Sequence, residues 1–414
     1  MSIAIISLSA LLAAIVLSMV SRINVGIVAI AAAWIVGVYL AGDKPDAVID
    51  GFPAALFITL AGTTLLFAIG ETNRSFAALA AHAMRLIGAS RLLVPIMFFL
   101  IAFLISAVGP GAISAVALVV PLAASIGARS EIPPMLTALM VANGANAGNL
   151  SPISAVGIIA NSSMAEGGLG GHEGAVMLAN FLAHVVVSVP VYIWYLARLR
   201  APATPDAEGA ADAERLTRAQ VLTLAVLGCW IFSVIVLKAN VGLSAFAAAA
   251  VLIVARAGDE RAVVKSIPWN VILMVCGVSL LVALVESHGG TALFSRMIAA
   301  IATPLTINGV VAFVTGAISI YSSTSGVVLP AFLPTVPGIV QSLGGGDPLE
   351  VALSINVGSS LVDVSPLSTL GALCVAALAK EGEGRKLFNA LLAWGFAMAL
   401  VGAFLSMTLV KLIA

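Results

Sequence analysis

Apolar runs separated by short polar breaks repeat along the whole chain. In its first part, five runs are long enough to be membrane-crossing helices: 3–20, 24–41, 53–70, 134–165 and 175–196. A helix of about 20 apolar residues spans a bilayer. The first run lacks the basic segment that begins a signal peptide, so we interpret it as a span of the mature protein. The pattern predicts an all-α, polytopic membrane protein.

One further apolar stretch, residues 92–127, is interrupted by Val108, Gly109, Pro110 and Gly111. Each arm has about 16 residues and would form about 24 Å of helix. The hydrocarbon core of a bilayer is about 30 Å thick. The arm length therefore favours a re-entrant helical hairpin over two complete spans. The charge pattern does not separate these alternatives, because both return the chain to the same side.

The second half of the chain repeats the first. Residues 24–43 and 240–259 are identical at eleven of twenty positions, at a constant offset of 216. More matches follow at offsets of 213 to 215: Pro53 with Pro268, Glu71 with Glu286, 109–121 with 322–334, Asn143 with Asn356, and 151–154 with 365–368. Small drifts in the offset are expected when a duplicated unit acquires short insertions.

The repeat predicts a first unit at 1–200, a polar cytoplasmic linker at 201–218 and a second unit at 219–414. The second unit has its own hairpin at 306–341 and its own broken helix at 348–380. We expect each unit to contain five transmembrane spans, a re-entrant hairpin and a broken helix. Because five spans are an odd number of crossings, the second unit enters the membrane inverted, as in many transporters.

Charge placement agrees with two inverted repeats. With the N-terminus outside, fifteen of the 19 Lys and Arg residues fall in cytoplasmic segments and four fall outside. This bias follows the positive-inside rule. We expect a multi-pass protein of the bacterial inner membrane with both termini in the periplasm. Segments 74–89 and 290–303 mix apolar and basic residues, and we interpret them as interfacial arm helices that lead into the hairpins.

Composition excludes several classes of protein. Only 9% of residues are charged and the net charge is zero, so no basic surface predicts nucleic-acid binding. The three cysteines lie within apolar runs and have no metal-ligand spacing. The chain also lacks a nucleotide-binding loop and a catalytic triad, which argues against an enzyme, ATP-driven transport or a resident cofactor.

The two hairpin tips are candidate anion sites. At each tip a helix would begin inside the membrane, where its free N–H groups and dipole attract negative charge. We expect these tip residues to bind a small carboxylate: Gly109, Pro110, Gly111 and Ser114 in the first repeat, and Ser322, Ser323, Thr324 and Ser325 in the second.

The two broken helices are candidate cation sites. Polar residues inside a span are costly unless they line a cavity, and free carbonyl and hydroxyl oxygens suit Na⁺. We expect Asn143, Asn146, Ser365 and Pro366 to contribute to the substrate site. The expected cation ligands are Ser106, Gly109, Asn143, Asn149, Ser151, Ser322, Asn356, Ser359, Ser360 and Asp363.

Four titratable residues need interpretation. Asp363 lies near the centre of a predicted span, and its repeat counterpart is Asn149 or Leu150. It could bind a cation, carry a proton or hydrogen-bond the backbone of the break. Glu71 and Glu286 end the third span of each repeat, where a bond to the arm helix is the simpler interpretation. We interpret His184 as a packing residue.

The paired tips and breaks resemble those of the ion transporter superfamily, and most closely the MatC-like dicarboxylate (malonate) carriers. These are distantly similar to the divalent anion/sodium symporters, whose tips carry Ser-Asn-Thr for substrate and sodium. The matching positions here are 109–111, Gly-Pro-Gly, and 322–324, Ser-Ser-Thr, so both tips lack the Asn. The resemblance implies a dicarboxylate substrate, sodium coupling, elevator-type movement and a homodimer.

The sequence therefore predicts symport of a small dicarboxylate such as malonate or succinate, coupled to Na⁺ or H⁺. The first alternative is a sodium/proton antiporter of the same fold that uses Asp363. The second is a membrane-embedded enzyme or an assembly subunit. The clustered catalytic residues of an enzyme are missing, and a scaffold has no use for paired polar breaks.

Overall fold

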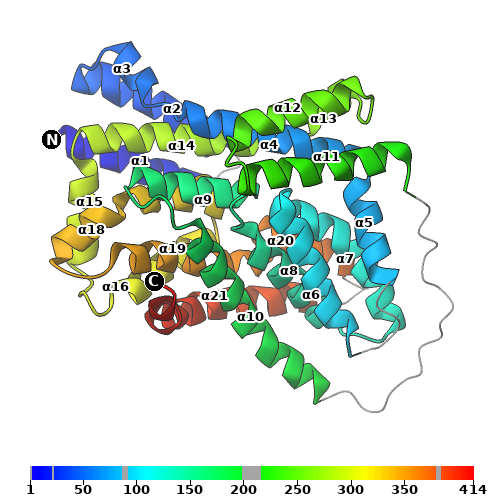
Figure 1. Ribbon diagram of the computed structural model, residues 1–414. Coiled ribbons are helices and arrows are strands. Elements are labelled where there is room, and N and C mark those ends of the chain that lie inside the picture. The colour runs from blue at the N-terminus through cyan, green and yellow to red at the C-terminus, as the bar shows by residue number, and fades with distance from the viewer. Residues whose placement is uncertain (1, 21–22, 86–91, 198–215, 379–383) are drawn as a thin grey trace.

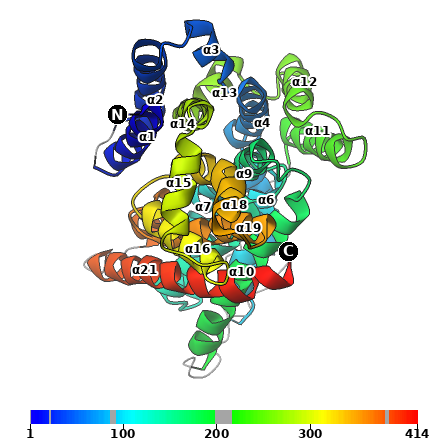
Figure 2. The ribbon, with the colours of Figure 1, turned by 90° about the vertical axis from the view of Figure 1, so that its left-hand side faces the viewer.

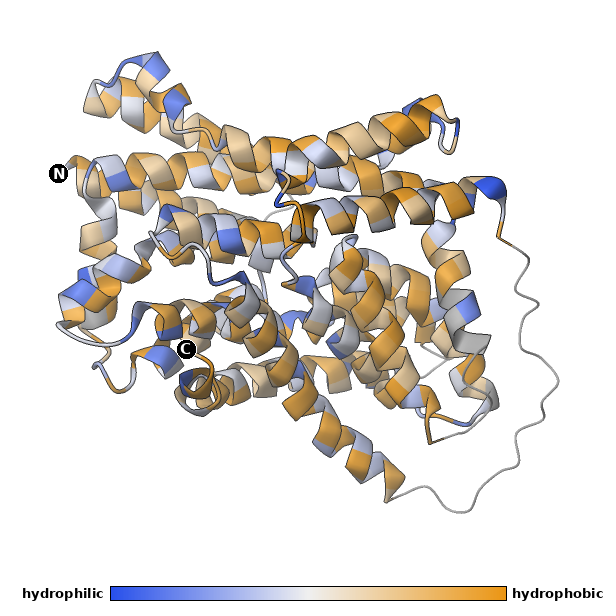
Figure 3. Cartoon of the chain, viewed as in Figure 1, coloured by the Kyte–Doolittle hydropathy of each residue, from blue (hydrophilic) through white to orange (hydrophobic). Residues whose placement is uncertain are grey.

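The computed structural model describes residues 2–20, 23–85, 92–197, 216–378 and 384–414. Every regular element in these ranges is helical. Seven of the described helices are long and apolar enough to cross a membrane. Hydrophobic residues predominate along the helices (Figure 3), and many large apolar side chains, such as Val254, Leu305 and Phe404, are exposed, as expected for a surface that faces lipid. The chain is a multi-pass membrane protein. Parts of the predicted arm helix (86–89), linker (201–215) and second broken helix (379–380) lie outside the described residues.

Six helices form a layer that we call the scaffold layer, at the top of Figure 1. They are α1 (Ile3–Val20), α2 (Val25–Trp34), α4 (Ala54–Thr72), α11 (Arg218–Ile235), α12 (Val241–Val254) and α14 (Trp269–Ser287). Helix α2 packs on α14, and α12 packs on α4. The layer therefore joins the two halves of the chain. The predicted span 24–41 is confirmed in extent, but its second part is a π-helix, η1 (Ile35–Ala41). Two short helices, α3 (Pro45–Asp50) and α13 (Glu260–Ser266), connect scaffold helices.

Glycines allow the scaffold helices to approach closely at two corresponding places. A Cβ on Gly277 would lie 2.3 Å from the Gly26 carbonyl oxygen, and a Cβ on Gly62 would lie 2.4 Å from that of Gly242. These pairs correspond at offsets of 216 and 215. Small residues at helix crossings are typical of membrane proteins. The packing within the scaffold thus follows the sequence repeat.

The remaining long helices form a second layer, the core layer, below the scaffold in Figure 1. They are α6 (Val94–Val108), α7 (Gly111–Arg129), α8 (Pro134–Asn149), α10 (Glu173–Leu196), α16 (Ile307–Ser319), α19 (Pro348–Leu361) and α21 (Gly384–Thr408). Here too the contacts correspond. A Cβ on Gly144 would lie 2.2 Å from the Phe99 carbonyl oxygen, and one on Gly358 would lie 2.4 Å from that of Ala312.

The chain passes between the layers through α5 (Ser75–Arg85) and α15 (Gly290–Ala299), which lie at opposite ends of the molecule in Figure 1, and Figure 2 shows the end at which α15 lies. Both run across the direction of the scaffold helices. They occupy the positions predicted for the arm helices. Each helix directly follows a residue with left-handed backbone: α5 follows Arg74 (φ 62°) and α15 follows Gly289 (φ 77°).

The two hairpins differ in their second arms. In the first hairpin, α7 continues for 19 residues to Arg129, so only α6, with 15 residues, is as short as predicted. The expected length of about 16 residues was therefore too short for α7, because the helix begins at Gly111 within the tip and ends at Arg129, beyond the predicted limit at residue 127. In the second hairpin, prolines divide the arm into four pieces: η2 (Thr324–Val328), α17 (Leu329–Phe332), η3 (Leu333–Thr335) and α18 (Val336–Leu343).

Candidate functional site

The first hairpin tip contacts the break in the first broken span. Helix α8 ends at Asn149, and α9 (Ala155–Glu166) begins after Ser154, whose Oγ accepts a hydrogen bond from the Gly157 N–H at 3.0 Å. The Asn149 Oδ1 atom accepts from the N–H of Ala112, in the first turn of α7, at 2.9 Å. The Gly109 carbonyl accepts from the N–H of Ala155 at 3.4 Å. A side chain and the backbone of the break thus hold the tip.

The second hairpin repeats this arrangement with an acidic residue. Thr324 Oγ1 donates to Asp363 Oδ1 at 2.7 Å and lies 3.4 Å from the Ser359 carbonyl oxygen. Ser319 also contacts Thr324. Asp363 therefore occupies the place that Asn149 has in the first half, at an offset of 214. The break continues into α20 (Thr369–Leu378). Of the two counterparts left open by the sequence, the structure favours Asn149 over Leu150.

The other predicted tip residues lie around these contacts. Gly111 has φ of 80°, and a Cβ there would lie 3.3 Å from Asn149 Oδ1. Pro110 is at the N-cap of α7 and cannot cap it with a side chain. Ser114 hydrogen-bonds the Glu71 side chain, which links the C-terminal end of α4 to the first hairpin. Ser323 Oγ caps η2 by accepting from the Gly326 N–H at 3.0 Å. Ser322 and Ser325 are half-buried.

Several predicted ligands are buried with free hydrogen-bonding atoms. Both polar atoms of the Asn143 side chain have no partner, and neither have Ser106 Oγ, Asn146 Oδ1 and Asn356 Oδ1. All four side chains are at most 1% exposed. Buried polar groups are normally hydrogen-bonded, so these atoms can still take a ligand. They are oxygens and amides from both halves of the chain, as a small polar solute or a hard cation requires.

Other predicted ligands are satisfied locally. Ser359 Oγ donates to the Ile355 carbonyl at 2.7 Å, one turn back in α19. Ser365 Oγ accepts from the Leu367 N–H at 3.3 Å, and Pro366 beside it is buried. The Ser151 carbonyl accepts from Ser154 Oγ at 3.0 Å. These residues shape the breaks. The carbonyls of Ser151 and Ser365 each accept two hydrogen bonds, from the N–H and Oγ of Ser154 and of Ser368, so both of their lone pairs are used.

Sequence reasoning missed Asn180 of α10. This fully buried residue contacts both broken spans. Its Nδ2 donates to the Asn146 carbonyl at 2.6 Å, and its Oδ1 accepts from Ser360 Oγ at 2.7 Å. His184, one turn on, donates from Nδ1 to the Asn180 carbonyl at 2.8 Å, which agrees with a packing role. An Asn within the apolar run 175–196 was the available signal.

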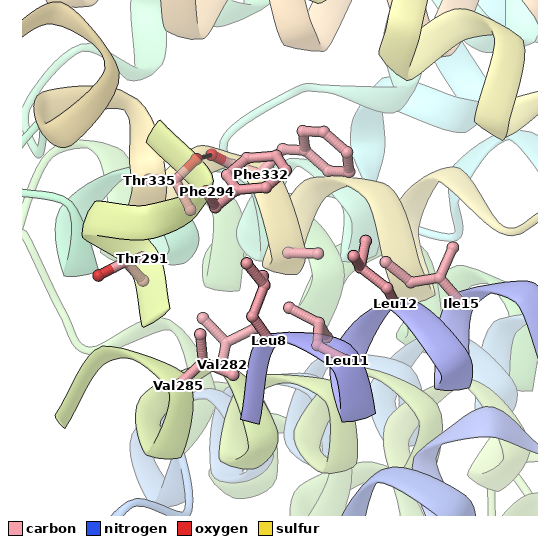
Figure 4. A pocket seen from close by; sticks show the side chains of 11 residues that line it. Leu8, Leu11, Leu12, Ile15, Val282, Val285, Thr291, Phe294, Phe332 and Thr335 are labelled. Carbon is pink, nitrogen blue, oxygen red and sulfur yellow. Dashed lines mark hydrogen bonds between the residues drawn. The ribbon is translucent and has the colours of Figure 1, made fainter. Parts of the chain in front are cut away.

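The two layers are not placed symmetrically against each other. In the first half, Gly109 at the hairpin tip packs on the ring of Phe67 of α4, where a Cβ would lie 1.8 Å from the ring. In the second half, the counterpart of Phe67 is Val282, at an offset of 215. Val282 lines an apolar cavity together with Ala331 and Phe332 of the second hairpin (Figure 4).

The two hairpins contact their scaffold helices at different levels, and the repeat gives the size of this displacement. Ala331 and Phe332 correspond to Leu118 and Val119, which lie nine and ten positions after Gly109 (118 − 109 and 119 − 109). At 1.5 Å per residue, the second hairpin is offset along its scaffold helix by about 14 Å relative to the first. The second tip reaches further along α14, where Gly326 packs on Met274. The symmetry is kept within each layer and lost between them.

The fold is shared with a transporter of known structure. The YdaH transporter of Alcanivorax borkumensis, whose crystal structure is described as having an unusual topology, matches with a TM-score of 0.56 and 15% sequence identity. The match covers 88% of this chain and 87% of that chain. A comparison with curated protein sequences finds no significant match. Fold and composition together define a multi-pass membrane protein that shares its fold with a transporter.

A family comparison refines this class. Residues 1–149 match the family described as the dicarboxylate carrier protein MatC N-terminus. The matched segment includes the first hairpin and α8, up to Asn149. The resemblance to MatC-like dicarboxylate carriers is therefore confirmed over this part of the chain.

Proposed function

We propose that the protein is a secondary active transporter that carries a small dicarboxylate, such as malonate or succinate, together with Na⁺. The observation that carries this proposal is the joining of each hairpin tip to a broken span, through Asn149 and Ala112 in one half and Asp363 and Thr324 in the other. Two helix N-termini then lie beside polar breaks in the interior of an apolar protein. The family match over residues 1–149 supports a carboxylate substrate.

The charges of the site support cotransport with a cation. Among the predicted site residues the titratable side chain is Asp363, and none is Lys or Arg. A dianion must therefore be neutralised by helix dipoles and bound cations. Asp363 and the unpartnered amide oxygen of Asn143 offer oxygen ligands for Na⁺. Na⁺ and the dicarboxylate would then bind next to each other and move together.

The offset between the layers supports an elevator-type movement. Suppose that the scaffold stays fixed and that each hairpin takes up the level that the other hairpin now has on its scaffold helix. The core layer then moves by about 14 Å. With the predicted orientation, the first hairpin is drawn towards the cytoplasm and the second reaches towards it, which corresponds to an inward-facing state. We propose that the outward-facing state places the first hairpin as the second is placed now. A homodimer held through the scaffold layer would keep that layer fixed.

Uptake of labelled malonate and succinate into proteoliposomes tests the proposed function. The protein is reconstituted and given an inward Na⁺ gradient, an inward proton gradient or neither, with protein-free vesicles as the control. Na⁺-dependent accumulation supports the proposed Na⁺ symporter. Accumulation that only a proton gradient drives would show that the coupling ion is H⁺ and not Na⁺. If neither substrate moves but a pH-sensitive dye reports Na⁺-driven proton exchange, the antiporter that uses Asp363 is the correct function.

A further inference from the structure

Asn180 lies where the two broken spans cross. It comes from α10, which carries none of the predicted site residues, and its side chain is fully buried. Asn146 of α8 donates from Nδ2 to the Ser360 carbonyl of α19 at 3.3 Å. With the bonds from Asn180 to Asn146 and from Ser360 to Asn180, three residues of three helices form a closed ring of hydrogen bonds.

The break in the first span explains why this ring forms. In a continuous helix, the Asn146 carbonyl would accept from the N–H of Leu150, four residues later. Here the Leu150 N–H donates to Gly148 and the Ser151 N–H does the same, so the carbonyls of Asn146 and Ala147 lose their helical donors. Asn180 Nδ2 lies 2.6 Å from the first carbonyl oxygen and 3.4 Å from the second. It replaces the bonds that the break removes.

The other side of Asn180 contacts the second span. Ser360 Oγ lies 2.7 Å from Asn180 Oδ1 and also 2.7 Å from the Asn356 carbonyl oxygen. Asn180 therefore connects the two broken spans through hydrogen bonds to Asn146 and Ser360. The unpartnered atoms of Asn146 and Asn356 border this ring, so its geometry fixes where those ligand atoms lie.

We infer that Asn180 is a positioning residue that holds the two broken spans in register, so that ligands bound at one break and the other are coupled. This inference rests on the proposed function for its effect on transport, but the ring itself can be tested without transport. A residue that only fills space in α10 would affect folding, whereas a positioning residue changes the apparent affinity for substrate and cation.

The test uses full-length protein in proteoliposomes, with malonate or succinate and Na⁺ varied separately. We expect Asn180→Leu to raise the KM for the dicarboxylate and for Na⁺ by about tenfold, with a smaller change in Vmax, because buried hydrogen bonds in both spans are lost. Asn180→Asp keeps the acceptor for Ser360 and the shape of the side chain, so its effect should be smaller. Ser188→Ala is the matched control, since this buried hydroxyl of the same helix has no partner.

Coupling between the two spans is measured with a double-mutant cycle. Asn180→Leu and Ser360→Ala should be non-additive in KM and in the thermal unfolding of the detergent-solubilised protein. Additive effects, an unchanged KM in Asn180→Leu, or an equal shift in Ser188→Ala would overturn the inference. If Asn180→Leu does not fold, Asn180→Ala, which also removes the acceptor for Ser360, takes its place in the cycle. If the wild type does not transport, the proposed function fails, and the unfolding cycle alone decides whether the ring couples the spans.

Discussion

Phe67 and Val282 occupy corresponding positions on two scaffold helices but meet different levels of their hairpins. Phe67 lies against the tip of the first hairpin at Gly109, whereas Val282 lies beside the second arm of the other hairpin at Phe332. The scaffold glycines pair symmetrically, as do those of the core. The asymmetry is therefore a displacement of one intact layer along the other. In the proposed movement, a second state would have the contacts of the two hairpins exchanged.

The first prediction concerns that second state. Glu71 and Ser114 are hydrogen-bonded in this structure. In the second half Met274 contacts Gly326, and the corresponding residues of the first half are Thr59 and Ile113, which should come into contact in the second state. In a background without Cys229, Cys276 and Cys374, we expect both Glu71→Cys/Ser114→Cys and Thr59→Cys/Ile113→Cys to cross-link with a short bifunctional reagent in membranes. Each cross-link should stop uptake. A protein in which only the first pair reacts, whatever ligands are present, would contradict the movement.

The second prediction concerns the charge of Asp363. Asp363→Asn keeps an oxygen that can accept from Thr324, as Asn149 does for Ala112, but removes the negative charge. We expect the variant to fold and its KM for Na⁺ to rise about tenfold or more, since bonds to charged groups are stronger than neutral ones. Na⁺-dependent uptake kinetics provide the measurement. Unaltered Na⁺ dependence would remove Asp363 from the cation site.

The third prediction concerns the second hairpin tip. Ser323→Ala with Thr324→Ala removes the cap of η2 and the hydroxyl that contacts Asp363. We expect the KM for the dicarboxylate to rise by about tenfold while the protein is still produced, because a lost cap costs only about 1 kcal/mol. Thr324→Ser keeps the hydroxyl and should transport normally. If the double variant transports like the wild type, this tip does not belong to the substrate site.

The fourth prediction separates stability from function at Asn143. Its buried amide has no partner, so Asn143→Leu should leave the Tm unchanged or raise it, because an unsatisfied polar group is removed. Uptake should nevertheless be lost. The control is Ser406→Ala, which removes another buried, unpartnered group but lies far along α21. A lower Tm in Asn143→Leu, or full uptake, would show that the amide serves packing.

Helix positions were predictable because apolar runs and their breaks are local signals. The breaks after Asn149 and Leu361, the tip at Gly109 and both arm helices are at the predicted places. The pieces of the second hairpin arm were not foreseen, since three prolines change the helix type only in combination with their packing. The role of Asn180 could not be predicted either. Its partners, Asn146 and Ser360, are 34 and 180 residues away in the chain.

The paired elbows at Arg74 and Gly289 give the arm helices a mechanical meaning. The two left-handed residues correspond at an offset of 215, and the helices beside them have 11 and 10 residues. Rods of that size are about 15 Å long, close to the offset between the layers. In the elevator movement proposed above, the arms would pivot at these elbows, and their length would limit how far the core layer moves. The elbow at Arg74 is the more strained of the two, since left-handed backbone costs a non-glycine residue about 1 kcal/mol or more.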